Sequence, residues 1–173
     1  KTVTLTGSTL GGTAAGNYTL TSPVTTTANI DALGITGNFT AANKTYNGST
    51  AATVLTRTLT GVIAGDVANV TLTGGTATFN DATTGTGKVV TLAGATLSGS
   101  AAGNYTLTSV GTTTAHITAL SITGSFTAAN KIYDGSTAAT VLTRTLSGVV
   151  AGDTANVGLT GGTATFGSAT VGG

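Results

Sequence analysis

The stretch NVTLTGGTATF, residues 69–79, alternates apolar and polar side chains along most of its length. Val70 and Leu72 alternate with Thr71 and Thr73, and after two glycines the pattern resumes with TATF. Successive side chains of a β-strand point to opposite faces of the sheet. The stretch therefore predicts a half-buried strand that turns aliphatic and aromatic side chains inward and threonines to water.

The same alternation occurs throughout the chain. It appears in ITGNFT (35–40), KVVTLAG (88–94), NYTLT (104–108) and TAHITA (114–119), with glycine, Asn-Gly or Asp-Gly between such runs. Strands separated by these turn residues are typical of antiparallel sheets. The side chains expected to face inward are Ile35, Phe39, Val70, Leu72, Ala77, Phe79, Val90, Leu92, Tyr105, Leu107, Ala115 and Ile117.

The composition favours an all-β fold and excludes several functions. Of 173 residues, 44 are threonine, which is at home on a pleated surface, while glutamate, glutamine, methionine and cysteine are absent. The net charge is +1 with no basic cluster, so we expect no nucleic-acid partner. No apolar run approaches the ~18 residues of a membrane span, so no membrane insertion is expected.

The chain repeats itself with a period of 87 residues. Shifted by that distance it aligns without a gap, Tyr18 on Tyr105 and Phe79 on Phe166, and 65 of the 86 overlapping positions carry the same residue. This period suits a small β-sandwich, predicted here as tandem antiparallel Ig-like modules. A threonine- and glycine-rich β-solenoid is the alternative.

The phase of the repeat divides the chain into three parts. IDAL (30–33) and ITAL (117–120) each run directly into a new strand pattern, which places module boundaries near Leu33 and Leu120. Residues 1–33 are then the C-terminal part of one repeat, 34–120 a complete repeat, and 121–173 the N-terminal part of the next. Either the chain is a section of a long array, or its two end parts complete each other head to tail.

The order of motifs resembles a known family. AANKIYDGSTAATV, SGVVAGD, LTGGTATF, LSGSAAGNYTLTS and TTTAHITAL are similar to the YDG repeats found in tandem in very large bacterial haemagglutinin-like surface adhesins. The resemblance covers the whole chain. It implies a β-rich stalk, secreted or attached to the cell surface, with no catalytic residues to carry over.

The name-giving motif reads KTYNG at 44–48 and KIYDG at 131–135. Asn47 replaces Asp134, but both Asn-Gly and Asp-Gly favour turns, so Gly48 and Gly135 are expected to keep a turn with positive φ. Tyr46 and Tyr133 are predicted to be structural, with the ring buried beside the turn and the hydroxyl satisfied locally.

Two arginines lie at strand positions whose side chains are expected to face inward, from the alternation of apolar and polar residues. Arg57 shares a face with Leu55 and Leu59, and Arg144 is its counterpart. One interpretation is an edge-strand charge that discourages sideways pairing. The other is a partly buried ion pair, Arg57 with Asp66 and Arg144 with Asp153.

The remaining candidate sites carry little chemistry. The one histidine, His116, has no second ligand type nearby and is expected to be a surface residue. Lys44 and Lys131 are candidates for an intramolecular isopeptide bond to an asparagine. Such a bond also needs an acidic side chain nearby, and the chain has few acidic residues. The sequence predicts no catalytic residue, metal site or cofactor. Six Asn-x-Ser/Thr sequons are possible glycosylation sites: Asn17, Asn38, Asn43, Asn47, Asn69 and Asn104.

These features predict a non-catalytic structural repeat of a bacterial cell-surface adhesin stalk or an extracellular filament. Its partners would be neighbouring copies of the repeat, joined head to tail. The alternative is an adhesin module that binds a host protein or a surface glycan through exposed loops such as GSAAGN (99–104) and NDATTGTG (80–87).

Overall fold

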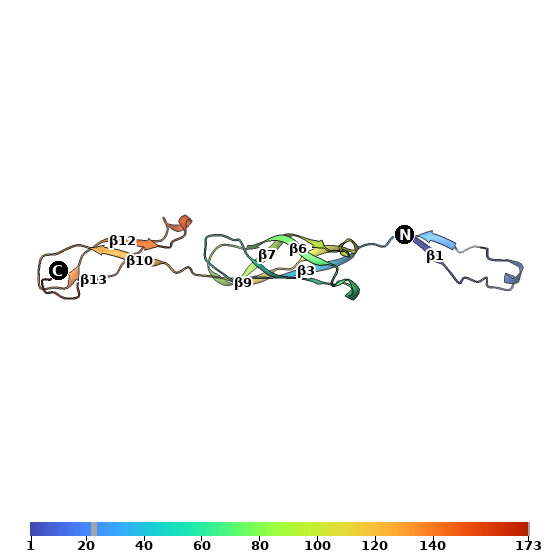
Figure 1. The fold of residues 1–173 in the computed structure, drawn as a ribbon, viewed down its shortest axis with the longest axis horizontal. Coiled ribbons are helices and arrows are strands. Elements are labelled where there is room, and N and C mark those ends of the chain that lie inside the picture. The colour runs from blue at the N-terminus through green and yellow to red at the C-terminus, as the bar shows by residue number, and fades with distance from the viewer. Residues whose placement is uncertain (22–23, 173) are drawn as a thin grey trace.

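The computed structural model describes residues 1–21 and 24–172, which contain strands, short 3₁₀ turns and loops but no α-helix (Figure 1). The N-terminal part holds β1 (Thr2–Leu5), η1 (Ala15–Asn17) and β2 (Val24–Thr27). The central part holds β3 (Leu33–Ala41), β4 (Lys44–Thr45), β5 (Val54–Thr60), η2 (Ala64–Asp66), β6 (Thr71–Phe79), β7 (Gly85–Ser98), η3 (Ala102–Asn104), β8 (Tyr105–Val110) and β9 (Thr113–Thr118). The C-terminal part holds β10 (Thr123–Ala128), β11 (Ala138–Ala139), β12 (Val141–Ser147), η4 (Ala151–Asp153) and β13 (Ala164–Thr165).

The central part forms two sheets. One has three strands in the order β5-β3-β8, and the other has four in the order β4-β9-β7-β6. The long hairpin of β6 and β7 runs in register from Thr71 opposite Ser98 to Phe79 opposite Val90. The predicted all-β class is therefore confirmed. The Ig-like subtype and the solenoid alternative stay predictions.

Over the described residues, two strand pairs depart from the predicted antiparallel arrangement, which the other pairs follow. β3 pairs with β8 in parallel, from Leu33 opposite Tyr105 to Gly37 opposite Val110, and β4 pairs in parallel with β9. Parallel pairing needs a long connection between the strands. The connection from β3 to β8 includes the whole β5 to β7 segment, so the first strand of the module lies beside one of the last.

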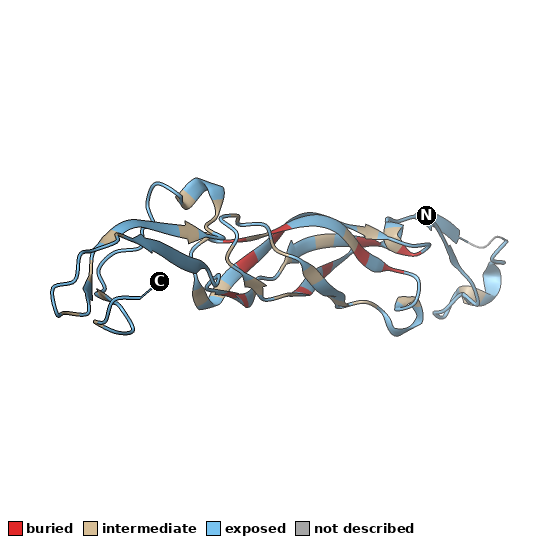
Figure 2. Cartoon of the chain, turned by 60° about the vertical axis from the view of Figure 1, so that its left-hand side comes forward, coloured by how far each residue is buried: buried red, intermediate tan, exposed pale blue. Residues whose placement is uncertain are grey.

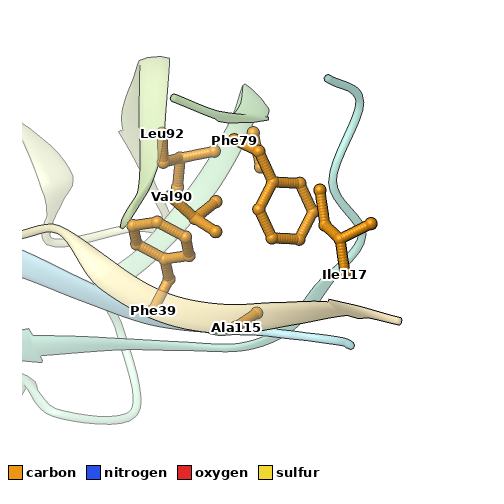
Figure 3. Close-up of a cluster of buried hydrophobic side chains, with 7 residues drawn as sticks. Phe39, Phe79, Val90, Leu92, Ala115 and Ile117 are labelled. Carbon is orange, nitrogen blue, oxygen red and sulfur yellow. The ribbon is translucent and has the colours of Figure 1, made fainter. Parts of the chain in front are cut away.

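Two clusters of buried side chains lie in the central part. The larger contains Phe39, Ala77, Phe79, Val90, Leu92, Ala115 and Ile117, contributed by β3, β6, β7 and β9 (Figure 3). The smaller contains Ile35, Val70, Ala101 and Tyr105. Most of these residues were predicted to face inward, which shows that strand alternation identifies the buried face here.

Threonines of the central part line the opposite faces and pair across neighbouring strands. The hydroxyls of Thr40 and Thr56 lie 2.6 Å apart between β3 and β5, and those of Thr78 and Thr91 lie 3.4 Å apart between β6 and β7. Cross-strand threonine pairs add to sheet stability while remaining in contact with water.

The three parts follow one another in line (Figure 1). Only residues 119–122 separate β9 from β10, and the buried residues of both clusters lie between Ile35 and Ile117, within the predicted repeat 34–120 (Figure 2). Within residues 1–21 and 24–172, we find no helix with the length and hydropathy of a membrane span.

Candidate functional site

The KTYNG loop is organised by its lysine. The ammonium group of Lys44 donates to Asn47 Oδ1 and to the carbonyl of Ala51, both at 3.0 Å, and to the carbonyl of Ser49. It also lies 5.3 Å from the centre of the Phe79 ring, an attractive cation–π arrangement. The loop is thus tied to the larger core cluster, which fixes the direction in which it projects Tyr46.

The turn itself has the same design in both copies. Ser49 N donates to Asn47 Oδ1 at 3.1 Å, as Ser136 N donates to Asp134 Oδ1 at 2.9 Å. The following glycines have φ of +75° at Gly48 and +74° at Gly135, so the predicted positive-φ turn is confirmed. An asparagine and an aspartate both accept this backbone hydrogen bond, which explains why the two are interchangeable.

The copy with aspartate adds an ion pair. Lys131 Nζ lies 2.7 Å from Asp134 Oδ1 and 5.7 Å from the centre of the Phe166 ring. The lysine, with help from the backbone and hydroxyl of Ser136, lowers the pKa of Asp134 to about 2. Because both side chains are partly exposed, this ion pair organises the loop more than it stabilises the fold.

Tyr46 joins the central part to the C-terminal part. Its hydroxyl donates to Asp153 Oδ2 at 2.6 Å, and its backbone N–H donates to the carbonyl of Thr118 at 2.8 Å. A Cβ added to Gly48 would lie 3.1 Å from Val150 Cγ1, so the two segments are also in close contact. The predicted local partner of the Tyr46 hydroxyl is therefore wrong, because the hydroxyl reaches a carboxylate 107 residues along the chain.

The acceptor of this bond lies in a short turn that recurs in each copy. Asp153 ends η4, and its counterpart Asp66 ends η2. Asp66 Oδ2 accepts a 2.7 Å bond from the hydroxyl of Tyr105, which in turn accepts from the N–H of Ile63 at 3.3 Å. In both copies the aspartate of the AGD sequence accepts a hydrogen bond from a tyrosine hydroxyl. Asp66 accepts it from Tyr105 of its own module, and Asp153 accepts it from Tyr46 across the junction.

The carboxylates change the acidity of both tyrosines. The hydrogen bond to Asp153 raises the pKa of Tyr46, with smaller contributions from burial and from the negative charge. The hydrogen bond to Asp66 likewise raises the pKa of Tyr105, again with burial adding to the effect. Both hydroxyls therefore stay protonated and able to donate up to pH 10, and the contribution of these bonds to stability is lost only as the pH rises beyond that value.

The predicted ion pair between Arg57 and Asp66 is not formed. Arg57 is exposed on β5, at the edge of its sheet, and one guanidinium nitrogen donates to the carbonyl of Gly74 at 3.0 Å. Asp66 is instead the partner of Tyr105. Arg144 is exposed at the matching position of β12, and Asp153 is the partner of Tyr46, so the interpretation as edge-strand charges fits both arginines.

The other predicted positions lie on the surface. His116 is exposed; its backbone N–H donates to Asn43 Oδ1 at 2.7 Å, and its ring Nδ1 accepts from Gly87 N at 2.9 Å. The six sequon asparagines are exposed as well. In the described ranges, no group of three or more histidine, cysteine or acidic side chains is placed to hold a metal ion.

One polar cluster does not follow from the sequence predictions. Lys88 in β7 reaches back to the preceding loop, where its Nζ lies 2.5 Å from Asp81 Oδ1. Thr83 donates to the same oxygen through its hydroxyl and, at 2.8 Å, its backbone N–H. Lys88, with help from Thr83, lowers the pKa of Asp81 to about 2. The signal in the sequence was the Asp-x-Thr pair, which favours a turn closed by the aspartate side chain.

Acid should loosen this loop in a defined range. Because the pKa of Asp81 is lower in the folded chain than in the unfolded one, its contribution to stability is present above about pH 4 and is lost as the pH falls through about 2. The Asp81→Asn variant should lose most of this acid dependence. Chemical shifts of the Thr83 amide between pH 5 and 1.5 would check it, with Asp31→Asn at an exposed carboxylate as the control; an unchanged titration in Asp81→Asn would contradict the assignment.

The Tyr46→Phe substitution should weaken the junction without disturbing either module. Losing one hydrogen bond to a carboxylate should lower the equilibrium constant for the docked arrangement by roughly 10- to 150-fold. Distances between spin labels on β7 and β12 should become more broadly distributed. The matched control is Tyr133→Phe, at the exposed tyrosine of the second copy. An equal broadening in both variants would mean that the contact with Asp153 does not hold the junction.

Comparison with known proteins identifies the repeat. The family model of the YDG domain matches twice, at residues 26–115 and 113–173. Neither the curated proteins nor the solved structures gave a significant match. The two matches together span 26–173, most of the chain, and include both copies of the KxYxG loop and of the AGD turn. The chain therefore belongs to the YDG domain family.

Proposed function

We propose that this chain is a non-catalytic structural repeat that adds length to an extended stalk. The observation that supports it most is the bond from Tyr46 to Asp153. Both residues recur with the 87-residue period, so each copy carries the donor for the following copy and the acceptor for the preceding one. Because every module carries both the tyrosine donor and the aspartate acceptor, further modules can be added in series through the same contact.

The connection between modules also favours a stalk. Residues 119–122 are too few for a flexible linker, and β10 starts where β9 has just ended. With the Tyr46 hydroxyl bond and the Gly48 to Val150 contact, this short connection limits bending. The chain enters the central module at one end and leaves at the other (Figure 1).

We place this stalk on the outside of a bacterial cell, in a haemagglutinin-like surface adhesin or an extracellular filament. The support is the tandem arrangement of two YDG matches and the predominance of small, uncharged surface side chains. Antibodies raised against residues 34–120 should label intact cells of the source organism, and labelling only after permeabilisation would refute this location.

The shape of isolated material tests the structural role. A nine-residue strand such as β3 spans about 30 Å at ~3.3 Å per residue, so negative-stain images should show rods with one bead every ~30–45 Å. X-ray scattering of the 173-residue chain should give the distance distribution of a rod at low concentration. A compact, rounded particle would refute the proposal.

The alternative function, binding of a glycan or host protein by exposed loops, has a separate test. The two loops that the sequence offered are held by their own contacts: Ala101 in GSAAGN is buried and its N–H donates to Asn69 O, while Asp81 and Lys88 close NDATTGTG. Loops that are held by their own contacts are compatible with a spacer as well as with a binding module. Saturable binding to a glycan array, lost when residues 80–87 are replaced, would favour the alternative.

A further inference from the structure

Asn47 and Gly48 form the one Asn-Gly pair in the chain. After an asparagine, the nitrogen of the next peptide unit can attack the carbonyl carbon of the side chain, which makes asparagine chemically labile. Glycine hinders this attack least because it has no Cβ. Both residues are exposed to water in the KTYNG loop, so the pair is a candidate for modification in the folded chain.

The turn folds the reacting groups toward each other. Asn47 Oδ1 accepts the N–H of Ser49, two residues on, at 3.1 Å. An asparagine carbonyl that makes this hydrogen bond is folded back over the intervening peptide unit, whose nitrogen belongs to Gly48. Over the described part of the chain, no protein group accepts the Gly48 N–H, so water can take its proton. A nucleophile held beside its target needs little further ordering before it reacts.

Two donors converge on the oxygen where negative charge would develop. When a nitrogen attacks Asn47 Cγ, the carbonyl oxygen Oδ1 becomes an oxyanion. Lys44 Nζ donates to this oxygen at 3.0 Å and Ser49 N at 3.1 Å, which are distances at which the donors of an oxyanion hole stabilise such charge. The Lys44 ammonium also donates to the carbonyls of Ser49 and Ala51, so its position is fixed before the reaction begins.

The second copy of the loop shows that the product of such a reaction fits. Position 134, the counterpart of Asn47, carries an aspartate and forms the same turn, with Ser136 N donating to Asp134 Oδ1 at 2.9 Å. Lys131 Nζ lies 2.7 Å from that oxygen as an ion pair. An aspartate at position 47 would therefore keep the turn and gain an ion pair with Lys44.

We propose that Asn47 is converted to aspartate in the folded chain by the loop that contains it. The Gly48 nitrogen forms a bond to Asn47 Cγ while its proton passes to water. The bond from Cγ to Nδ2 then breaks, and the side-chain nitrogen takes up a proton from water and leaves as ammonia. Lys44 and Ser49 stabilise the charge on Oδ1 and are not consumed. The intermediate that remains is a five-membered cyclic imide.

The same ammonium directs the second step. Water can open the imide at either of its two carbonyl carbons, and the Lys44 ammonium polarises the carbonyl at Cγ. Attack there adds the water oxygen to Cγ, breaks the bond from Cγ to the Gly48 nitrogen and returns a proton to that nitrogen. The ordinary backbone is restored with an aspartate at position 47, rather than rerouted through the side chain as isoaspartate. The net charge of the chain falls from +1 to zero, whether or not the chain is part of a stalk.

Incubation of the whole chain at mildly alkaline pH, followed by peptide mass spectrometry, tests the conversion. The peptide that contains residue 47 should gain about 1 Da and carry aspartate. The same chain unfolded in guanidinium chloride has no ammonium fixed on the carbonyl, so its product should be mainly isoaspartate, as in free Asn-Gly peptides. An unchanged Asn47, or an excess of isoaspartate in the folded chain, overturns the proposal. A lasting mass loss of one ammonia also overturns it, because that would mean a bond from Lys44 to Asn47.

The Lys44→Met variant tests the role of the ammonium. Conversion at residue 47 should be roughly tenfold slower and should give more isoaspartate, because one of the two donors to Oδ1 is gone. Lys44→Arg keeps the charge and should restore part of the aspartate excess. Lys131→Met, at the matching lysine of the second copy, is the control and should leave residue 47 unaffected. Equal or faster conversion in Lys44→Met overturns the proposal. The comparison in guanidinium chloride uses the unchanged sequence, so it tests the proposal even where Lys44→Met loosens the loop.

Discussion

Replacing Phe39 by alanine is expected to remove about 3–5 kcal/mol from the free energy of unfolding of the central module. Phe39 is in the larger core cluster, in contact with both sheets (Figure 3). A module of about 87 residues has a total stability of only ~4–13 kcal/mol. The variant should therefore be largely unfolded at 37 °C or melt far below the wild type, as followed by circular dichroism and urea titration.

The chain supplies its own control for this substitution. Phe126 has the same strand pairing, opposite Arg144 as Phe39 is opposite Arg57, but its side chain is exposed. Phe126→Ala should change the free energy of unfolding by no more than about 0.5 kcal/mol. Equal losses in the two variants would contradict the assignment of the core to residues 35–117.

The Gly99→Ala substitution is expected to cost the central module about 2–4 kcal/mol. Gly99 follows β7 with φ of +115°, a conformation that residues with a Cβ avoid. A Cβ built there would lie 2.2 Å from the carbonyl oxygen of Asn69, so the two backbone segments would have to separate. The same carbonyl accepts the N–H of Ala101, and that 3.0 Å hydrogen bond would be disturbed as well.

Gly103→Ala is the matched control, four residues further along the same loop. No heavy atom lies within 4 Å of a Cβ built on Gly103, and its φ is not positive. Its effect on the midpoint of urea unfolding should be within about 0.5 kcal/mol. A Gly99→Ala variant as stable as Gly103→Ala would show that the loop after β7 relaxes freely, contrary to its close contact with Asn69.

The buried face of each strand could be predicted from the sequence, but the neighbours of each strand could not. Alternation placed Ile35, Val70 and Ile117 on inward faces because side-chain direction is a local property with a period of two. Which strand lies beside β3 depends on long-range pairing. The parallel neighbour β8 starts at Tyr105, far along the chain, and no local pattern encodes that choice.

The junction was outside the reach of sequence reasoning for the same reason. The sequence predicts a turn at the KxYxG loop and a local partner for the Tyr46 hydroxyl, but that partner is Asp153 in the following copy. An ion pair between Asp66 and Arg57 is one of the two interpretations open for that arginine, whereas the partner of Asp66 is Tyr105, 39 residues along the chain. Opposite charge favours an Arg57–Asp66 ion pair, but the fold places the Tyr105 hydroxyl against the Asp66 carboxylate instead.

The parallel pairing of β3 with β8 would determine how a module of the proposed stalk carries tension. A pull enters at Leu33, where β3 begins, and leaves beyond Thr118, where β9 ends. It draws β3 and the segment of β8 and β9 in opposite directions along their length, so the hydrogen bonds between Leu33 and Gly37 on one strand and Tyr105 and Val110 on the other are loaded together. Bonds sheared together resist more force than bonds unzipped singly, so each module of the proposed stalk would resist extension through its backbone geometry.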